Sequence, residues 1–326
     1  MAVKFGLQIP SFTFPTRPKE NVWNVGRELA VEAENHGFDS IWLMDHLFQI
    51  PVVAAETDPL LECWTGLAAL AAATKRVRLG SMVAAAGFRN PAVLAKMTST
   101  IDVVSNGRLI VGIGAGWCEW EHKAYGIDFP AIGVRMKKLE DSLNILKAMW
   151  TQERATYEGQ YYQARGAVNS PKPVQKPHPP ILIGGSGEKV TLRLCAQYAQ
   201  AHNLGGGSPE QNAKTLQTLK EHCQKLGTDY NKILKTRLQP IMFAKDEKEL
   251  QRKMEKYTPP GYPGQDRKKH LEQRTLIGTG EQIAAQLQKY VDIGIDYFIV
   301  SFWDADDFEN VRKVQKELMP RLKSKV

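Results

Sequence analysis

Residues 41–46 read Ile41-Trp42-Leu43-Met44-Asp45-His46, an apolar run that ends in a carboxylate and an imidazole. A short, continuous apolar run is typical of a buried strand in a parallel sheet. In α/β folds, ligands bind at the carboxyl ends of such strands. We therefore expect Asp45 and His46 to face a site, with His46 as the candidate acid or base.

Further apolar runs alternate with amphipathic or alanine-rich stretches. The predicted strands are Phe5–Ile9, Ser40–Met44, Val77–Ala84, Leu109–Ile113, Ile181–Ile183, Ala201–Leu204, Arg237–Phe243 and Tyr297–Phe302. The predicted helices are residues 21–36, 63–74, 91–104, 135–150, 189–198, 209–226 and 309–322. This succession predicts an α/β fold, a TIM (β/α)8 barrel with loop insertions, as a single domain over residues 1–326. A doubly wound sheet is the alternative, but the strand count and the uniform composition favour the barrel.

The chain is longer than the roughly 250 residues that a barrel typically needs, and two stretches account for much of the surplus. Residues 156–180 are rich in proline and poor in apolar periodicity, which predicts a loop insertion. Residues 257–274 contain Pro259-Pro260-Gly261-Tyr262-Pro263-Gly264 and are predicted to form a second loop. The sequence leaves open whether this second loop closes over the site as a lid.

Charge and composition argue against several classes of function. The 326 residues carry a net charge of +8, but the basic residues are spread over predicted helix faces rather than gathered in a stripe with aromatics. This spread favours a small anionic ligand over nucleic acid. The sequence has no apolar run of the ~18 residues that cross a bilayer and no signal-peptide pattern. We therefore expect a cytoplasmic protein with a small-molecule substrate, no nucleic-acid partner and no membrane partner.

The sequence does not predict a metal site or a disulfide framework. Cys63, Cys118, Cys195 and Cys223 are widely separated and form no C-x-x-C pair. The chain also has no H-x-H or H-E-x-x-H spacing, so no metal ligand is predicted.

Two glycine-rich segments follow predicted strands. In Gly112-Ile113-Gly114-Ala115-Gly116-Trp117, the tryptophan stands where a dinucleotide-binding fingerprint needs its third glycine. We interpret this segment as a barrel strand whose backbone a flat group can approach. The N–H groups of Gly184-Gly185-Ser186-Gly187, before a predicted helix, are suited to hold a phosphate. A plain strand-to-helix turn is the alternative for this second segment.

Aromatic residues occur near the predicted strand ends, namely Phe12, Phe14, Phe48, Trp117, Trp120, Phe302 and Trp303. Several aromatics at one barrel mouth would form a flat apolar slot. A slot, a phosphate-binding loop and an imidazole together predict a site for a flavin-like ring with a phosphate tail.

Several segments along the chain form a recognisable set: residues 38–46, 90–96, 105–108 with 112–117, 121–130, and 171–175 with 179–185. In this set the chain resembles the bacterial luciferase-like superfamily, and within it the oxidoreductases that depend on the deazaflavin coenzyme F420. The motifs are specific to the superfamily, and FMN-dependent members share most of them.

The resemblance implies a cofactor at the carboxyl ends of the barrel strands. The implied cofactor-binding residues are Asp45, His46, Ser81, Met82, Val83, Ala84, Ala115, Gly116, Gly184, Gly185, Ser186 and Gly187. The last four would bind the phosphate and the others would lie against the ring. Family members carry a non-prolyl cis peptide after the third strand, at the place of Ser81–Met82. Relatives commonly dimerise, so a homodimer is expected.

One position departs from the family pattern. The sugar-phosphate dehydrogenases of this family carry a catalytic glutamate directly after the glycine-rich strand, where this chain has Trp117. We therefore expect a more apolar substrate than a sugar phosphate. The sequence leaves open whether Glu119 or Glu121 replaces that glutamate.

The resemblance and the site residues together predict hydride transfer between coenzyme F420 and a small organic substrate. His46 would be the catalytic residue that moves the accompanying proton. The first alternative is an FMN-dependent monooxygenase that uses reduced flavin and oxygen. Two others are a non-catalytic flavin carrier and a metal-dependent barrel hydrolase.

Overall fold

A closed barrel of parallel strands organises the computed structural model, which describes residues 2–14, 21–261, 266–304 and 308–324. The barrel strands are β1 (Lys4–Ile9), β2 (Ser40–Leu43), β3 (Arg78–Ser81), β5 (Leu109–Gly114), β8 (Ile181–Gly184), β9 (Ala201–Leu204), β10 (Leu234–Phe243) and β12 (Tyr297–Phe302). Each pairs in parallel with the next, and β12 pairs with β1 to close the ring. The predicted TIM barrel is therefore confirmed.

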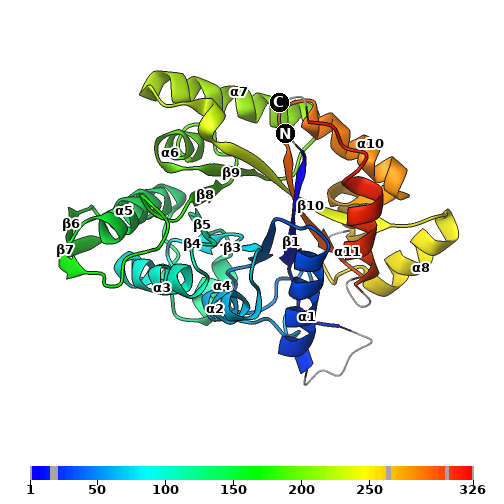
Figure 1. The fold of residues 1–326 in the computed structure, drawn as a ribbon, viewed down its shortest axis with the longest axis horizontal. Helices are drawn as coiled ribbons and strands as arrows, with labels where there is room; N and C mark the ends of the chain where they lie inside the picture. Colours follow the sequence, from blue (N-terminus) through cyan, green and yellow to red (C-terminus); the bar gives the residue numbers. More distant parts are fainter. Residues whose placement is uncertain (1, 15–20, 262–265, 305–307, 325–326) are drawn as a thin grey trace.

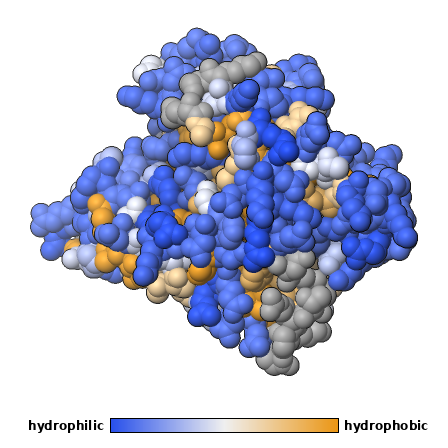
Figure 2. Space-filling model, turned by 45° about the vertical axis from the view of Figure 1, so that its right-hand side comes forward, coloured by the Kyte–Doolittle hydropathy of each residue, from blue (hydrophilic) through white to orange (hydrophobic). Residues whose placement is uncertain are grey.

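Helices surround the barrel (Figure 1). They are α1 (Val22–Asn35), α2 (Cys63–Ala73), α3 (Pro91–Val104), α4 (Glu119–Ala124), α5 (Ile132–Thr151), α6 (Thr191–Tyr198), α7 (Pro209–Leu226), α8 (Glu247–Tyr257), α9 (Arg267–Arg274), α10 (Gly280–Val291) and α11 (Glu309–Lys313), with a π-helical turn at Val314–Leu318. None of the described helices is both long and apolar enough to span a membrane. The face in Figure 2 is mostly hydrophilic, with smaller hydrophobic areas between the charged residues.

Successive side chains along each strand point alternately toward the helices and into the barrel, which gives the core two layers. On β2, Ile41 and Leu43 pack into the large outer cluster beneath the helices, whereas Trp42 packs into a second cluster with Tyr297 and Ile299. Because successive side chains of a strand point to opposite faces, this second cluster fills the inside of the barrel. The strands are apolar on both faces for this reason, which is why they were recognisable as continuous runs.

The predicted loop at residues 156–180 is wrong in its first part. An antiparallel hairpin forms there from β6 (Arg154–Glu158) and β7 (Gln163–Val168), and it packs against α5 (Figure 1). The prediction failed because the two strands, RATYE and QARGAV, contain few large apolar residues and several long polar ones.

The predicted loop at residues 257–274 is also partly wrong. Helix α9 occupies Arg267–Arg274, and a short strand β11 (Leu276–Gly278) then pairs with the end of β10. Residues 262–265 lie outside the described residues.

The third predicted strand divides into β3 and a short β4 (Ala84–Ala85), which pairs with the end of β5. Between them, the Met82–Val83 peptide is cis. The expected bond was Ser81–Met82, so the predicted position is wrong by one residue. The interruption pushes residues 82 and 83 toward the barrel axis, where both join the inner cluster.

Gly112 makes this interruption possible. A Cβ at Gly112 would lie 1.9 Å from the Ser81 carbonyl oxygen, and the Ser81 hydroxyl donates to the Gly112 carbonyl at 2.8 Å. Because the clash is with backbone, Gly112→Ala should destabilise the protein by about 3 kcal/mol, the upper part of the range for overpacking. Chemical denaturation measures this change. Gly133→Ala is the control, since a Cβ there meets nothing within 4 Å and should change stability by less than about 1 kcal/mol.

Candidate active site

A cavity of about 360 Å³ opens at the carboxyl ends of β2, β5, β8 and the β3–β4 interruption. Its wall includes predicted site residues: Asp45, His46, Met82, Val83, Ala115, Gly116, Gly184 and Gly185. Apolar side chains from α5 and β10 complete it: Ile132, Met136, Leu139 and Leu238. Its size and its mixture of apolar walls with few polar groups are typical of a small-molecule site.

His46 is held by the buried carboxylate of Glu121, one of the two glutamates that the sequence left open, and the contact between them was not predicted. Its Nδ1 lies 2.9 Å from Oε2 of Glu121, and the side chain of His46 is 12% exposed while that of Glu121 is fully buried. The other carboxylate oxygen accepts from the backbone N–H of Leu47. Because a carboxylate only accepts, Nδ1 carries the proton, and the neutral ring has its free lone pair on Nε2.

The surroundings of Glu121 favour its ionised form. Burial alone would raise the pKa of Glu121, but hydrogen bonds from His46 and the Leu47 amide outweigh it, so the pKa lies below its ordinary value. Burial and the nearby Glu121 charge raise the pKa of the Cys118 thiol, which keeps it protonated. His46, Cys118 and Glu121 each offer an atom that could bind a metal ion, and these atoms lie within 4.8 Å of one another. Hydrogen bonds with each other already engage the imidazole and the carboxylate.

Asp45 faces a different partner. Arg89 donates to both of its carboxylate oxygens at 2.7 and 2.9 Å and also to Glu62 at 2.6 Å. Burial raises the pKa of Asp45, and the Arg89 charge opposes that rise. This bidentate pair ties the end of β2 to the loop after β4, so the Asp45 carboxylate orients the backbone next to His46.

Val83 forms part of the cavity wall and rests on glycines of two neighbouring strands. A Cβ at Gly114 would lie 3.2 Å from Val83, and one at Gly184 would lie 3.3 Å from it. These small residues leave room for the displaced segment to enter the barrel mouth. Ser81 and Ala84 are fully buried behind this wall, where Ser81 hydrogen-bonds Gly112 and Ala84 pairs with Ile113.

The second glycine-rich segment lies at the other end of the cavity. Gly185 has a φ of +111°, which permits the sharp turn after β8, and Thr191 begins α6 beside it. Ser186 and Gly187 are exposed just beyond the cavity wall. Helix N-termini and glycine loops attract anions through their free N–H groups, so this end suits a phosphate.

The aromatic slot is smaller than predicted. Trp117 lines the cavity at 53% exposure, with its ring edge-on to His46 at a centroid distance of 5.7 Å. Trp120 packs edge-on against Trp117 at 5.5 Å. Other members of the predicted set belong to the main core instead: Phe12, Phe14 and Phe302.

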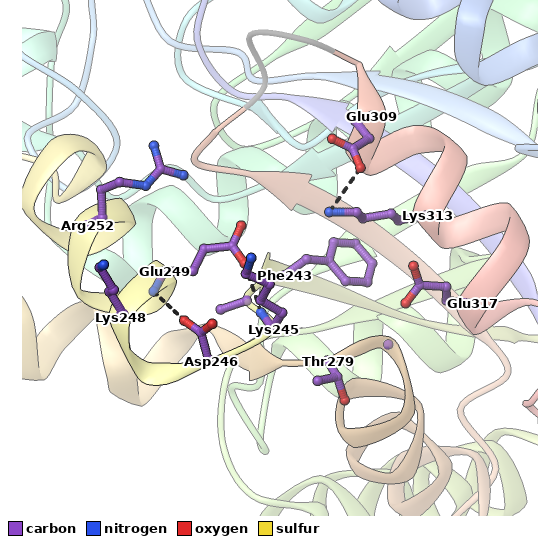
Figure 3. Close-up of a pocket in the computed structure, with 12 residues that line it drawn as sticks. Phe243, Lys245, Asp246, Lys248, Glu249, Arg252, Thr279, Glu309, Lys313 and Glu317 are labelled. Carbon is purple, nitrogen blue, oxygen red and sulfur yellow. Dashed lines mark hydrogen bonds and ion pairs between the residues drawn. The ribbon is translucent and has the colours of Figure 1, made fainter.

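A larger, more open cleft of about 830 Å³ lies between α8, the start of α10 and α11 (Figure 3). Charges of both signs line it: Lys245, Asp246, Lys248, Glu249, Arg252, Glu309, Lys313 and Glu317. Several of these charges satisfy each other, as with Glu309 and Lys313 at 3.2 Å. Its described lining residues include no imidazole or thiol, so the smaller cavity is the better candidate for chemistry.

Arg89 and His122 of the smaller site were not predicted, and Glu121 was considered only as a possible replacement for the family's catalytic glutamate. Glu121 and His122 lie on α4, which the sequence analysis did not identify because it has six residues. A signal was present, since positions 118, 121 and 122 share one helical face by their spacing of three and four. All three side chains are buried.

Comparisons with known proteins identify the family to which this chain belongs. The sequence pattern of the luciferase-like monooxygenase family matches residues 3–297. An F420-dependent glucose-6-phosphate dehydrogenase of Microbacterium testaceum (strain StLB037) is 27% identical over 319 residues, which cover 91% of this chain and 93% of that protein. A protein of the same name from Segniliparus rotundus is 25% identical over 350 residues, with 99% of each chain covered.

Solved structures share the fold. An F420-dependent secondary alcohol dehydrogenase in complex with an F420–acetone adduct superposes with a TM-score of 0.83 at 20% identity, over 99% of this chain and 100% of that one. Monooxygenase RslO1 from Streptomyces bottropensis superposes with a TM-score of 0.81 at 21% identity, over 97% and 99%. At these identities the superpositions establish the barrel and its connections. With the family match over most of its length, this chain belongs to the luciferase-like monooxygenase family and is an oxidoreductase of that family.

Proposed function

We propose that this protein is an F420-dependent oxidoreductase that transfers a hydride between the deazaflavin and a small organic substrate. The observation that carries the proposal is the buried His46–Glu121 pair in the wall of an apolar cavity. Full-length relatives named as F420-dependent dehydrogenases support the choice of cofactor.

The residues of the cavity fit a flat ring with a phosphate tail. Gly114, Gly184 and Gly116 keep side-chain atoms away from the wall, where a Cβ would come within 3.2–3.3 Å of a neighbour. Val83 and Met82 would lie against the ring, and the Gly185–Thr191 segment would hold the phosphate. When bound, the deazaflavin supplies hydride transfer at its ring.

The chain's own residues would manage the proton and the solvent. His46 lines the cavity with its Nδ1 held by Glu121, so its Nε2 would donate or accept the proton that accompanies hydride transfer. Glu121 would fix the tautomer and direction of that ring. Met82, Val83 and Leu238 would exclude water from the reacting atoms.

The cavity also informs the choice of substrate. Its described lining residues include no lysine or arginine, and Arg89 is already paired with Asp45 and Glu62. A phosphate group on the substrate would therefore meet no free cation among the described residues that line the cavity. An uncharged substrate therefore suits the site better than the sugar phosphate in the names of the relatives.

The second candidate is an FMN-dependent monooxygenase, because a monooxygenase also shares this fold. Titration of the apo-protein with F420 and with FMN, followed by cofactor fluorescence, separates the two. We expect micromolar or tighter affinity for F420 and affinity for FMN that is at least tenfold weaker. Tight FMN binding without F420 binding would contradict the proposal. Tight F420 binding with no turnover against any acceptor would indicate a carrier protein instead.

A further inference from the structure

We propose that His122 binds a hydroxyl group of the ligand that occupies this cavity. The proposal rests on the proposed function in placing a ligand there, but it concerns a second imidazole that the proton step does not use. His122 lies on α4, one residue after Glu121, and it is 1% exposed.

One ring nitrogen of His122 is fixed by the backbone. Its Nδ1 lies 2.8 Å from the carbonyl oxygen of Cys118. A carbonyl can only accept, so Nδ1 carries the proton and, in the neutral ring, Nε2 is a bare acceptor. The local helix therefore sets which kind of group His122 can bind, namely a hydrogen-bond donor.

Two glycines leave the Nε2 edge uncovered. A Cβ at Gly87 would lie 3.5 Å from Nε2, and a Cβ at Gly116 would lie 3.8 Å from it. Gly116 has a φ of +79°, a conformation that favours glycine, and both His122 and Gly116 line the cavity. Larger residues at these positions would cover the imidazole edge, so the approach to Nε2 is open from the cavity.

Aromatic rings surround the remaining faces of His122. Phe88 lies at a centroid distance of 4.6 Å and Phe129 at 4.9 Å, and the Arg135 guanidinium lies over the Phe129 ring, 3.8 Å from its centroid. These rings supply no strong donor, and no described side chain or backbone group hydrogen-bonds Nε2. His122 lines the cavity, so a ligand or water that donates a hydrogen bond can satisfy the acceptor at Nε2.

A hydroxyl is the donor that matches this site. A hydroxyl group is uncharged, so it suits these apolar surroundings, and it can donate a hydrogen bond to the one free ring nitrogen. In this cavity it has two possible sources: the polyol chain that joins a deazaflavin ring to its phosphate, and an alcohol substrate. Either source gives the same O–H to Nε2 contact.

The experiment compares the wild-type protein with His122→Phe and His122→Gln. Phenylalanine keeps the ring volume beside Phe88 and Phe129 and removes the acceptor, whereas the glutamine amide oxygen can restore it. The first probes are three deazaflavins: intact F420, the ring with its polyol chain but no phosphate, and the ring with a methyl group instead of the chain. The second set of probes, which is added to the F420-bound protein, consists of cyclohexanol and its methyl ether. Thermal melts confirm that both variants are folded.

If the cofactor supplies the hydroxyl, His122→Phe weakens binding of both polyol-bearing deazaflavins roughly tenfold, leaves the methyl-bearing ring unchanged, and His122→Gln recovers most of the loss. If the substrate supplies it, His122→Phe binds each deazaflavin as tightly as the wild type does, and the preference for cyclohexanol over its ether disappears in this variant. Unchanged affinities and an unchanged alcohol preference would overturn the proposal. Failure of the wild-type protein to bind any deazaflavin would instead count against the proposed function.

Discussion

His46→Ala should lower turnover by roughly 10²- to 10⁴-fold and change the affinity for F420 by less than about threefold. The reason is geometric. The imidazole of His46 lines the cavity and has only Nε2 left for a substrate, but the wall against which a ring would lie is made by Met82, Val83 and the glycines. Removing the imidazole thus removes a proton donor and leaves the binding surface. Stopped-flow hydride transfer and a cofactor titration on the same sample measure the two quantities separately.

His36→Ala is the matched control, because His36 ends α1 and hydrogen-bonds the Glu32 carbonyl at 2.8 Å rather than facing the cavity. It should retain full turnover. If His46→Ala turns over at the wild-type rate, His46 has no part in the proton step. If the variant loses cofactor affinity as strongly as turnover, the imidazole binds the ring rather than acting on the substrate.

The barrel could be predicted from sequence because its strands are buried on both faces. Ile41-Trp42-Leu43 is apolar at every position, and Tyr297–Phe302 departs from this only at Ser301, so both segments can be identified as continuous apolar runs of strand length. Polar residues directly after an apolar strand then locate the site, which is why Asp45 and His46 were found. The hairpin β6–β7 has neither property, and its short strands lie outside the barrel.

The contacts within the site could not be predicted, since they depend on segments far apart in sequence. Glu121 meets His46 across 75 positions, and Arg89 meets Asp45 across 44. A periodic pattern shows that Glu121 shares a helix face with Cys118, but it does not show what that face meets. The glycines of β5 illustrate the same limit: they admit the Ser81–Val83 segment of a neighbouring strand, a role that spacing alone does not reveal.

Glu121→Gln should lower turnover by about 100-fold with little change in cofactor affinity. Both carboxylate oxygens accept hydrogen bonds, one from His46 Nδ1 and one from the Leu47 amide. An amide has only one acceptor oxygen, so its NH2 group must face one of these two donors. If it faces His46, the imidazole must turn or change tautomer, and Nε2 no longer presents its lone pair to the substrate. Loss of the orienting carboxylate has large effects in other histidine-dependent enzymes for this reason.

The pH dependence of stability provides an independent check on Glu121. Its pKa is lower in the folded protein than the ordinary value of 4.5, so the ionised carboxylate stabilises the fold above that pH, and this contribution is lost as the pH falls through the lowered pKa. The difference in unfolding free energy between wild type and Glu121→Gln should therefore be largest near neutral pH and narrow in acid. Glu119→Gln is the control, because Glu119 is exposed and pairs only with Lys123 among the contacts described.

A Glu121→Gln enzyme with normal turnover would show that His46 does not need its carboxylate partner. A stability difference that stays constant down to pH 3 would show that Glu121 is not held ionised by His46 and Leu47.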